Sequence, residues 1–92
     1  MSRLPITVSF EGDQGDVAVL TVRGDLDGEF AVHLDRITDR LLATNFDGDV
    51  ILDLNEMGEI HARARRAMYR THELLTARGH RLSSRPPTPD IW

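Results

Sequence analysis

Val50-Ile-Leu-Asp-Leu-Asn-Glu-Met-Gly-Glu-Ile-His-Ala-Arg-Ala-Arg-Arg-Ala-Met68 is the stretch that decides the fold. Residues 50–54 form a short apolar run without a turn former, which predicts a buried strand. Residues 55–59 are polar, and Gly58 is the expected turn residue of a loop. The pattern then changes to one helix face, with small or apolar side chains at Ala64, Ala67, Met68, Thr71, Leu74 and Leu75. A strand that feeds a helix through a short loop is where α/β sheets usually place a working site.

The residues before this stretch predict a hairpin and a first helix. Residues 6–10 alternate apolar and polar side chains, and residues 17–23 form a second strand after a glycine-containing turn. Asp27 is placed to cap the next helix. The apolar stripe of that helix consists of Phe30, Leu34, Ile37 and Leu41. Its end falls near residues 44–48, where Asn45 is the expected left-handed residue.

The second long helix is expected over about residues 62–77, with Gly79 as its C-terminal cap. Residues 80–84 predict a weak edge strand, because Leu82 is the only strongly apolar residue among them. Strand 50–54 should lie parallel to strand 17–23, since a helix connects them. The sequence therefore predicts an α/β fold: a mixed sheet of about four strands with two main helices packed on one face.

Length and composition set the domain organisation. With 92 residues the chain forms one domain, which we place at 1–85. The remaining 86–92 segment is a Pro-rich tail, because three prolines within four positions exclude a helix. Its Ile91-Trp92 pair either stays free, folds onto the sheet or serves an interface.

Charge and composition exclude several classes of function. There is no cysteine, no apolar run of membrane length and no signal-peptide core, so we expect a cytoplasmic protein without membrane insertion. The net charge of −4 argues against nucleic-acid binding. Residues 1–60 carry four arginines against 13 acidic residues, whereas residues 61–92 carry seven arginines against two. The basic half is either a solvated helix face or part of a bipolar surface that orients a partner.

Two short motifs are similar to those of a known protein family. The first is Leu52-Asp53-Leu54, followed by apolar Met57 and Ile60, and the second is Gly24-Asp25-Leu26-Asp27. They resemble, respectively, the central strand and turn and the Gly-Glu-Leu-Asp at the end of the second strand in the STAS domain of bacterial anti-sigma-factor antagonists. The resemblance covers about residues 15–80 and implies a STAS-like fold in which the final family helix is missing.

The family's phosphorylation motif is not kept. Its Asp-Ser-Ser/Thr-Gly sequence aligns with His61-Ala62-Arg63-Ala64, so Arg63 takes the position of the phosphorylated hydroxyl and cannot accept phosphate. The resemblance implies a protein partner, either an anti-sigma factor or a kinase-like regulator. The partner-binding surface that it implies consists of Asp25, Asp27, Gly58, His61, Ala62, Arg63, Ala64 and Arg66. The alternatives are a structural or accessory STAS subunit of a larger assembly or transporter, a homo-oligomer, and a small-anion sensor.

The start of the second helix is unfavourable by itself. His61 supplies no acidic cap. Such a cap usually stabilises a helix by about 1 kcal/mol. Arg63, Arg65 and Arg66 add positive charge at the helix end where the macrodipole disfavours it. Drift after loss of phosphorylation, selection for a cationic patch that meets an acidic partner, and an anion site are the three explanations.

No pattern in the sequence predicts an enzyme or a bound cofactor. There is no nucleophile with a base, and His33, His61, His72 and His80 lack metal-ligand spacing. The remaining chemical possibility is acid–base or cation-binding work by carboxylates gathered at the strand ends. These carboxylates would be Asp25, Asp27, Asp53 and Glu56.

Overall fold

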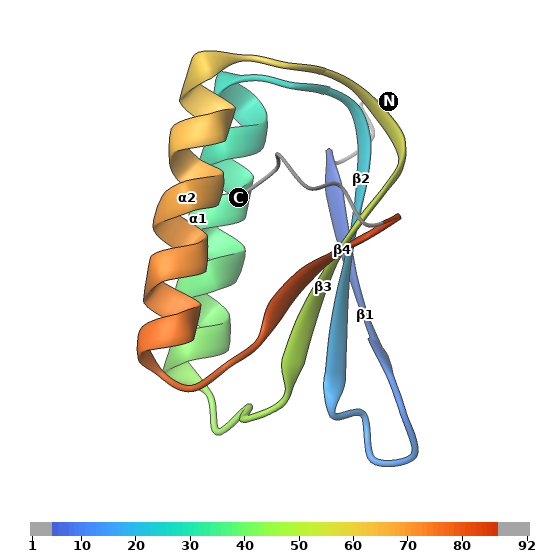
Figure 1. The fold of residues 1–92 in the computed structure, drawn as a ribbon, viewed down its shortest axis with the longest axis vertical. Coiled ribbons are helices and arrows are strands. Elements are labelled where there is room, and N and C mark those ends of the chain that lie inside the picture. Colours follow the sequence, from blue (N-terminus) through green and yellow to red (C-terminus); the bar gives the residue numbers. More distant parts are fainter. Residues whose placement is uncertain (1–4, 87–92) are drawn as a thin grey trace.

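A computed structural model describes residues 5–86, which form a four-stranded sheet with two helices side by side on one face (Figure 1). The strands are β1 (Ile6–Glu11), β2 (Val17–Leu26), β3 (Asp49–Ile60) and β4 (Leu82–Arg85), in the spatial order β1-β2-β3-β4. The helices are α1 (Gly28–Ala43) and α2 (Ala62–Ala77). β1 pairs antiparallel with β2, and the other neighbours pair in parallel. The predicted α/β class and mixed sheet are confirmed.

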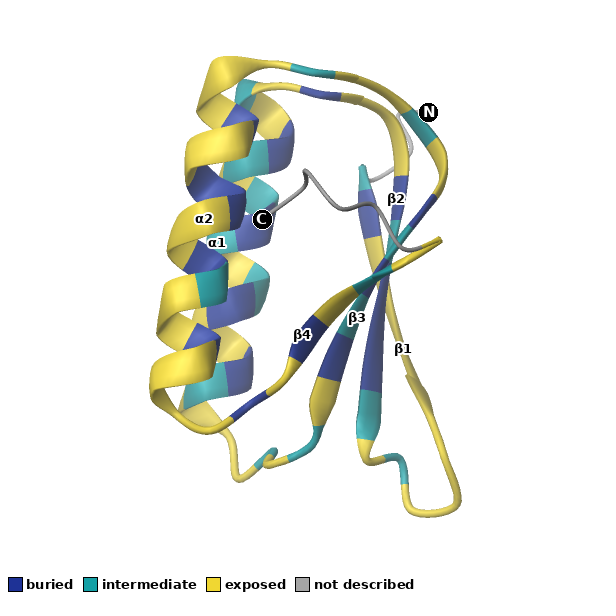
Figure 2. Cartoon of the chain, in the orientation of Figure 1, coloured by how far each residue is buried: buried dark blue, intermediate teal, exposed yellow. Residues whose placement is uncertain are grey.

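The core lies between the helices and the two central strands (Figure 2). Alternate residues of β2 and β3 face it, because side chains of a strand alternate between its two faces. Phe30 and Leu34 of α1 and Met68 of α2 are almost fully buried against them. The small side chains of Ala64 and Ala67 have no exposed surface, as expected where a helix packs closely. Leu74, which we placed on the same face, is instead 42% exposed, because it lies at the margin of that face.

Two of the three predicted helix caps are present in the structure. The carboxylate of Asp27 accepts the backbone N–H of Phe30 at 3.1 Å, which confirms the predicted N-cap of α1. Gly79 has a φ of +86°, and its N–H and that of His80 bond to carbonyls in the last turn of α2. The prediction of a left-handed Asn45 is wrong. Thr44 ends α1 in an extended conformation, and its hydroxyl bonds the Leu41 carbonyl and the Phe46 N–H, so no left-handed residue is needed.

β2 and β3 extend further than the sequence predicts. Residues 55–59 were expected to form a loop, but they continue β3 to Ile60, opposite an equally prolonged β2. Gly58 is therefore a strand residue with no positive φ rather than a turn residue. The pairing shifts register between Thr21 and Arg23 and again between Gly24 and Leu26. Such irregularities let a polar and glycine-containing segment remain in a sheet.

Both edge strands carry partly apolar sequences. Only Ile6 of β1 is buried, because the helices cover β2 and β3 and leave most of β1 open. β4 is the predicted edge strand and buries Leu82 beside Val50 of β3. Of the predicted tail, 87–92 with its Ile91-Trp92 pair lies outside the described residues.

Candidate functional site

The predicted site lies where β2 and β3 end and both helices begin (Figure 1). Because β2 and β3 are parallel and each is followed by a helix, the starts of α1 and α2 come to the same edge of the molecule. The backbone N–H of His61 donates to the carbonyl of Leu26 at 2.8 Å and ties the two strand–helix junctions together. Residues from two distant parts of the sequence therefore form one surface.

Asp25 and Gly58 fix the conformation of this edge. Oδ1 of Asp25 accepts the backbone N–H of Glu59 at 2.9 Å, a cross-strand bond outside the regular ladder. A Cβ atom at Gly58 would lie 2.2 Å from the same oxygen, so a side chain there would displace the Asp25 carboxylate from its bond to Glu59. Both residues are exposed, but their first role is to hold the ends of β2 and β3 in register.

The first turn of α2 presents a cluster of arginines without an N-terminal cap. His61 occupies the N-cap position and makes no side-chain capping bond, as the sequence predicts. Arg63, Arg65 and Arg66 are exposed, and none of them makes an ion pair with a residue in the described range 5–86. The Arg63 side chain leans toward the start of α1, where a Cβ added to Gly28 would lie 3.7 Å from its Nη1.

One of the predicted site residues does not reach the surface. Ala64 has no exposed area and packs in the core beneath α2, so it cannot contact a partner directly. The structure exposes the other seven, which are Asp25, Asp27, Gly58, His61, Ala62, Arg63 and Arg66. We refer to these seven residues as the helix-start surface.

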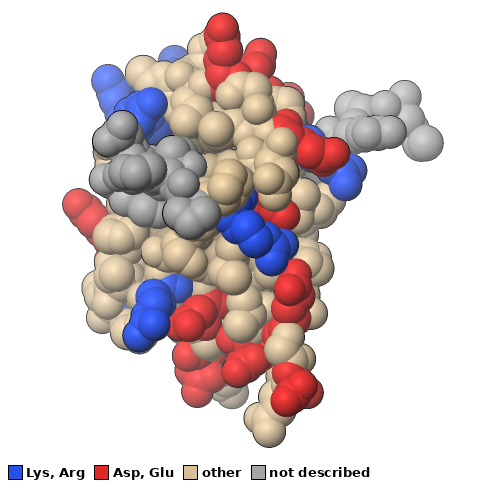
Figure 3. Space-filling view, turned by 45° about the vertical axis from the view of Figure 1, so that its right-hand side comes forward, with Lys and Arg blue, Asp and Glu red and all other residues tan. Residues whose placement is uncertain are grey.

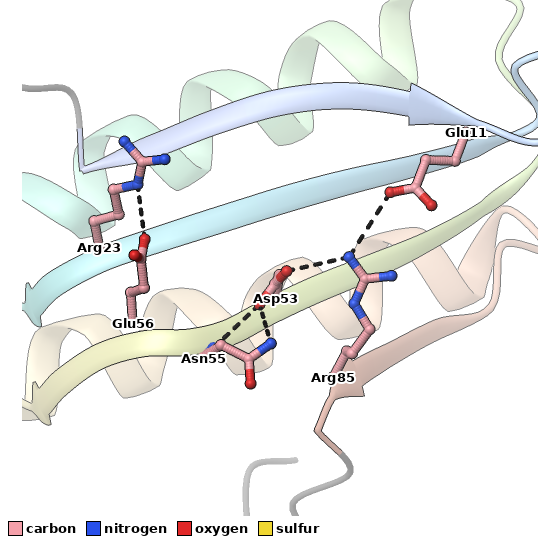
Figure 4. Close-up of polar contacts among 6 residues, drawn as sticks. All are labelled: Glu11, Arg23, Asp53, Asn55, Glu56 and Arg85. Atoms are coloured by element: carbon pink, nitrogen blue, oxygen red, sulfur yellow. Dashed lines mark hydrogen bonds and ion pairs between the residues drawn. The ribbon is translucent and has the colours of Figure 1, made fainter.

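The four carboxylates considered for acid–base work do not converge. Asp27 caps α1 and Asp25 holds Glu59, as described above. Glu56 pairs with Arg23 at 2.9 Å, and Asp53 pairs with Arg85 at 3.1 Å (Figure 4). Each carboxylate has its own partner, and no group of three potential metal ligands occurs among the residues that the structure describes.

The open face of the sheet carries a network that the sequence patterns did not reveal. Nη2 of Arg85 on β4 lies 3.1 Å from Asp53 Oδ2 on β3 and 3.7 Å from Glu11 Oε2 on β1 (Figure 4). The Arg85 side chain therefore links the two edge strands across the sheet. The ion pair between Arg85 and Asp53 also stabilises the pairing of β4 with β3, in addition to the burial of Leu82.

The contacts of Asp53 in this network shift its pKa. Its pKa is lowered, first by the backbone N–H of Asn55, which donates to Oδ1 at 3.1 Å, and then by the side chains of Arg85 and Asn55. Partial burial opposes this effect, since the side chain is only 16% exposed. The ionised carboxylate is thus held by three donors in the folded state.

This lowered pKa makes the stability of the fold sensitive to acid. A carboxylate with a lower pKa in the folded than in the unfolded state stabilises the fold above its unfolded pKa, which is about 3.9. That contribution disappears as the pH falls through the folded pKa. We expect Asp53→Asn to be clearly less stable than the wild type at pH 7 and nearly equal to it at the acid limit. Urea unfolding of both proteins between pH 2 and pH 7 measures this difference in stability. Asp39→Asn, which removes an exposed charge from α1, is the control.

Acidic side chains also gather at the opposite end of the molecule. Figure 3 shows several of them at the lower end of the molecule, where the β1–β2 turn and the loop before β3 lie in Figure 1, with a basic side chain beside them. The exposed acidic residues of this end are Glu11, Asp13, Asp16, Asp47 and Asp49. The helix-start surface, in contrast, mixes arginines with Asp25 and Asp27.

The architecture is that of a STAS domain, and solved structures share it. A STAS domain described as an antisigma-factor antagonist from Rhodobacter sphaeroides superposes with a TM-score of 0.62 and 13% identity, covering 90% of this chain and 88% of that one. This likeness confirms the fold that the motifs predicted.

The chain is also similar to part of a longer protein. A crystal structure of Mglu matches with a TM-score of 0.70 and 28% identity over 90% of this chain but only 20% of the Mglu chain. Another, of native Mglu in 4.3 M NaCl, matches with a TM-score of 0.65 and 21% identity, covering 90% of this chain and 26% of that one. The chain thus spans about a fifth to a quarter of these Mglu chains. No family model and no curated protein matches the sequence. No described helix combines the length and apolar character needed to cross a membrane.

Proposed function

We propose that this chain is a non-enzymatic protein-binding domain that engages its partner through the helix-start surface. The observation that carries this proposal is the exposed first turn of α2, where arginines without ion pairs in the described range stand at an uncapped helix start. Exposed guanidinium groups that satisfy no neighbour inside the domain suit a partner with carboxylates, because arginine forms bidentate bonds with them. The shared fold with an antisigma-factor antagonist supports the same general role.

The partner implied by the motifs is an anti-sigma factor or a kinase-like regulator. In the family, a phosphoryl group added at the start of this helix controls the complex. Arg63 carries a fixed positive charge at the aligned position and has no hydroxyl to receive that phosphoryl group. Binding through this surface is therefore constitutive with respect to that site, and control comes from the amount of partner or from competition.

Charge reversal at Arg66 tests this proposal. We expect Arg66→Glu to weaken binding of an acidic partner about tenfold or more, equivalent to about 1.4 kcal/mol. The partner is first recovered with the tagged wild-type chain from its own host and identified by mass spectrometry. The affinities of purified partner for wild type and variant are then compared by calorimetry.

Arg78→Glu provides the matched control, since Arg78 is an exposed arginine at the other end of α2. Its affinity for the partner should equal that of the wild type. If both substitutions weakened binding equally, the effect would come from the change in net charge and not from the position of Arg66. If Arg66→Glu bound the partner with unchanged affinity, Arg66 would not contact the partner, and the proposed surface would be contradicted.

A second candidate function is that of an accessory module in a larger assembly. The Mglu match favours it, because there the same fold occupies about a fifth of a longer chain. This role predicts a constitutive complex or self-assembly, whereas the first predicts a monomer that binds its partner reversibly. Light scattering after size-exclusion chromatography separates the two, and a stable oligomer of the purified chain would favour the module.

A further inference from the structure

A groove runs between β1 and α1, on the side of the molecule away from α2. One hollow of about 230 Å³ in it is lined by Val8, Phe10, Ile37, Arg40, Leu41 and Thr44. A neighbouring hollow shares three of these residues and adds Ile6, Thr7, His33 and Arg36. Val8 is 40% and Phe10 56% exposed, although both face the helix side of the sheet. The floor of the groove is thus apolar and accessible.

The free backbone groups of β1 belong to the same residues that line this groove. The N–H of Arg23 bonds to the carbonyl of Pro5 at 3.0 Å, which marks these two residues as a hydrogen-bonded pair. Because such pairs alternate along antiparallel strands, residues 7, 9 and 11 also turn their backbone groups toward β2. Ile6, Val8 and Phe10 then present theirs to the outer edge, where none of strands β2 to β4 pairs with them.

The rim of the groove is positively charged. Arg36 and Arg40 are exposed, and neither makes an ion pair within residues 5–86. A second copy of the chain that paired with β1 across a two-fold axis would bring these arginines toward their own counterparts, and like charges in contact are unfavourable. An acidic occupant meets no such repulsion.

We propose that this groove binds an extended acidic peptide segment of a partner protein by strand addition to β1. The peptide backbone bonds to Ile6, Val8 and Phe10, its alternate apolar side chains enter the groove, and its flanking carboxylates pair with Arg36 and Arg40. This surface shares no residue with the helix-start surface, so the two proposals stand or fall independently.

A labelled heptapeptide, Glu-Thr-Val-Ser-Leu-Thr-Glu, provides the probe, because its odd positions place two carboxylates around two apolar side chains on one face. We expect saturable binding by fluorescence anisotropy, weakened by added salt. Lysine in place of both glutamates, or N-methylation of the valine, serine and leucine amides, should abolish it, since these changes remove the charge match or the backbone donors that face β1 in either strand direction. Amide shifts in an NMR titration should map to β1 and α1.

Arg40→Glu should lower the affinity for the peptide at least tenfold, whereas Arg66→Glu should leave this affinity unchanged. Phe10→Thr should also weaken it. Val32→Thr should not, because Val32 is an apolar residue of α1 that is also about half exposed but lies outside the groove. Circular dichroism confirms that each variant is folded. No saturable binding, shifts confined to α2, or a dimer of the chain formed through β1 would each overturn the proposal.

Discussion

Gly48→Ala is expected to lower the free energy of unfolding by about 3 kcal/mol, the upper end of the range for overpacking. A Cβ atom at Gly48 would lie 1.7 Å from the carbonyl oxygen of Asp16 and 2.6 Å from its carbonyl carbon. These are backbone atoms, so no side chain can rotate away. The Asp16 carbonyl also accepts the N–H of Asp49 at 3.1 Å, where β2 and β3 begin to pair.

The relief of this clash would disturb a second contact as well. The carbonyl of Gly48 bonds to Nδ1 of His80 at 2.8 Å, and the His80 ring stacks on Phe46. A shift of Gly48 would therefore loosen the junction between α2 and β4 together with the start of β3. Urea denaturation gives the loss directly. Gly28→Ala is the matched control, since only the Arg63 side chain lies near, at 3.7 Å, and we expect no loss of stability. Equal effects of the two substitutions would contradict this account of Gly48.

Local signals were sufficient for the order of the elements and for most of their ends. The switch from an apolar run at 50–54 to a helical period after residue 62 identified β3 and α2, because these periods are properties of neighbouring residues. Asp27 and Gly79 acted as caps as expected, since capping depends on a few adjacent backbone groups.

Contacts between distant segments account for what the sequence did not reveal. Glycine is typical of turns, but the carboxylate of Asp25, 33 positions before Gly58, holds that part of β3 in the sheet. The Arg85 network joins three strands and leaves no periodic signal. Ala64 lies within the aligned motif, which implied a partner contact, whereas the helical period placed it on the apolar face of α2; its burial agrees with the helical period.

The interface between the two helices contains a further long-range contact, between two buried threonines. Thr38 of α1 and Thr71 of α2 are each 2% exposed, and their hydroxyl oxygens lie 3.0 Å apart. The Thr38 hydroxyl also donates to the carbonyl of Leu34 at 2.8 Å. Because a hydroxyl has one hydrogen, Thr71 is the donor of the bond between the helices.

Either single substitution of this pair by valine is expected to lower the free energy of unfolding by about 2 kcal/mol. Thr38→Val keeps the side-chain shape but leaves the buried Thr71 hydroxyl without its acceptor, and a buried polar group without a partner is destabilising. Thr71→Val removes the donor to Thr38. The double variant replaces both hydroxyls by methyl groups and should lose less than the two single variants together, with a coupling of about 1 kcal/mol or more.

Thermal and urea unfolding of the three variants and the wild type complete this cycle. Thr21→Val, on the open face of the sheet, serves as a control for the substitution itself. Additive losses would show that each threonine acts alone, through its own helix. A strong coupling would identify the pair as a polar contact that fixes α1 against α2, and hence the positions of the two helix starts that carry the proposed binding surface.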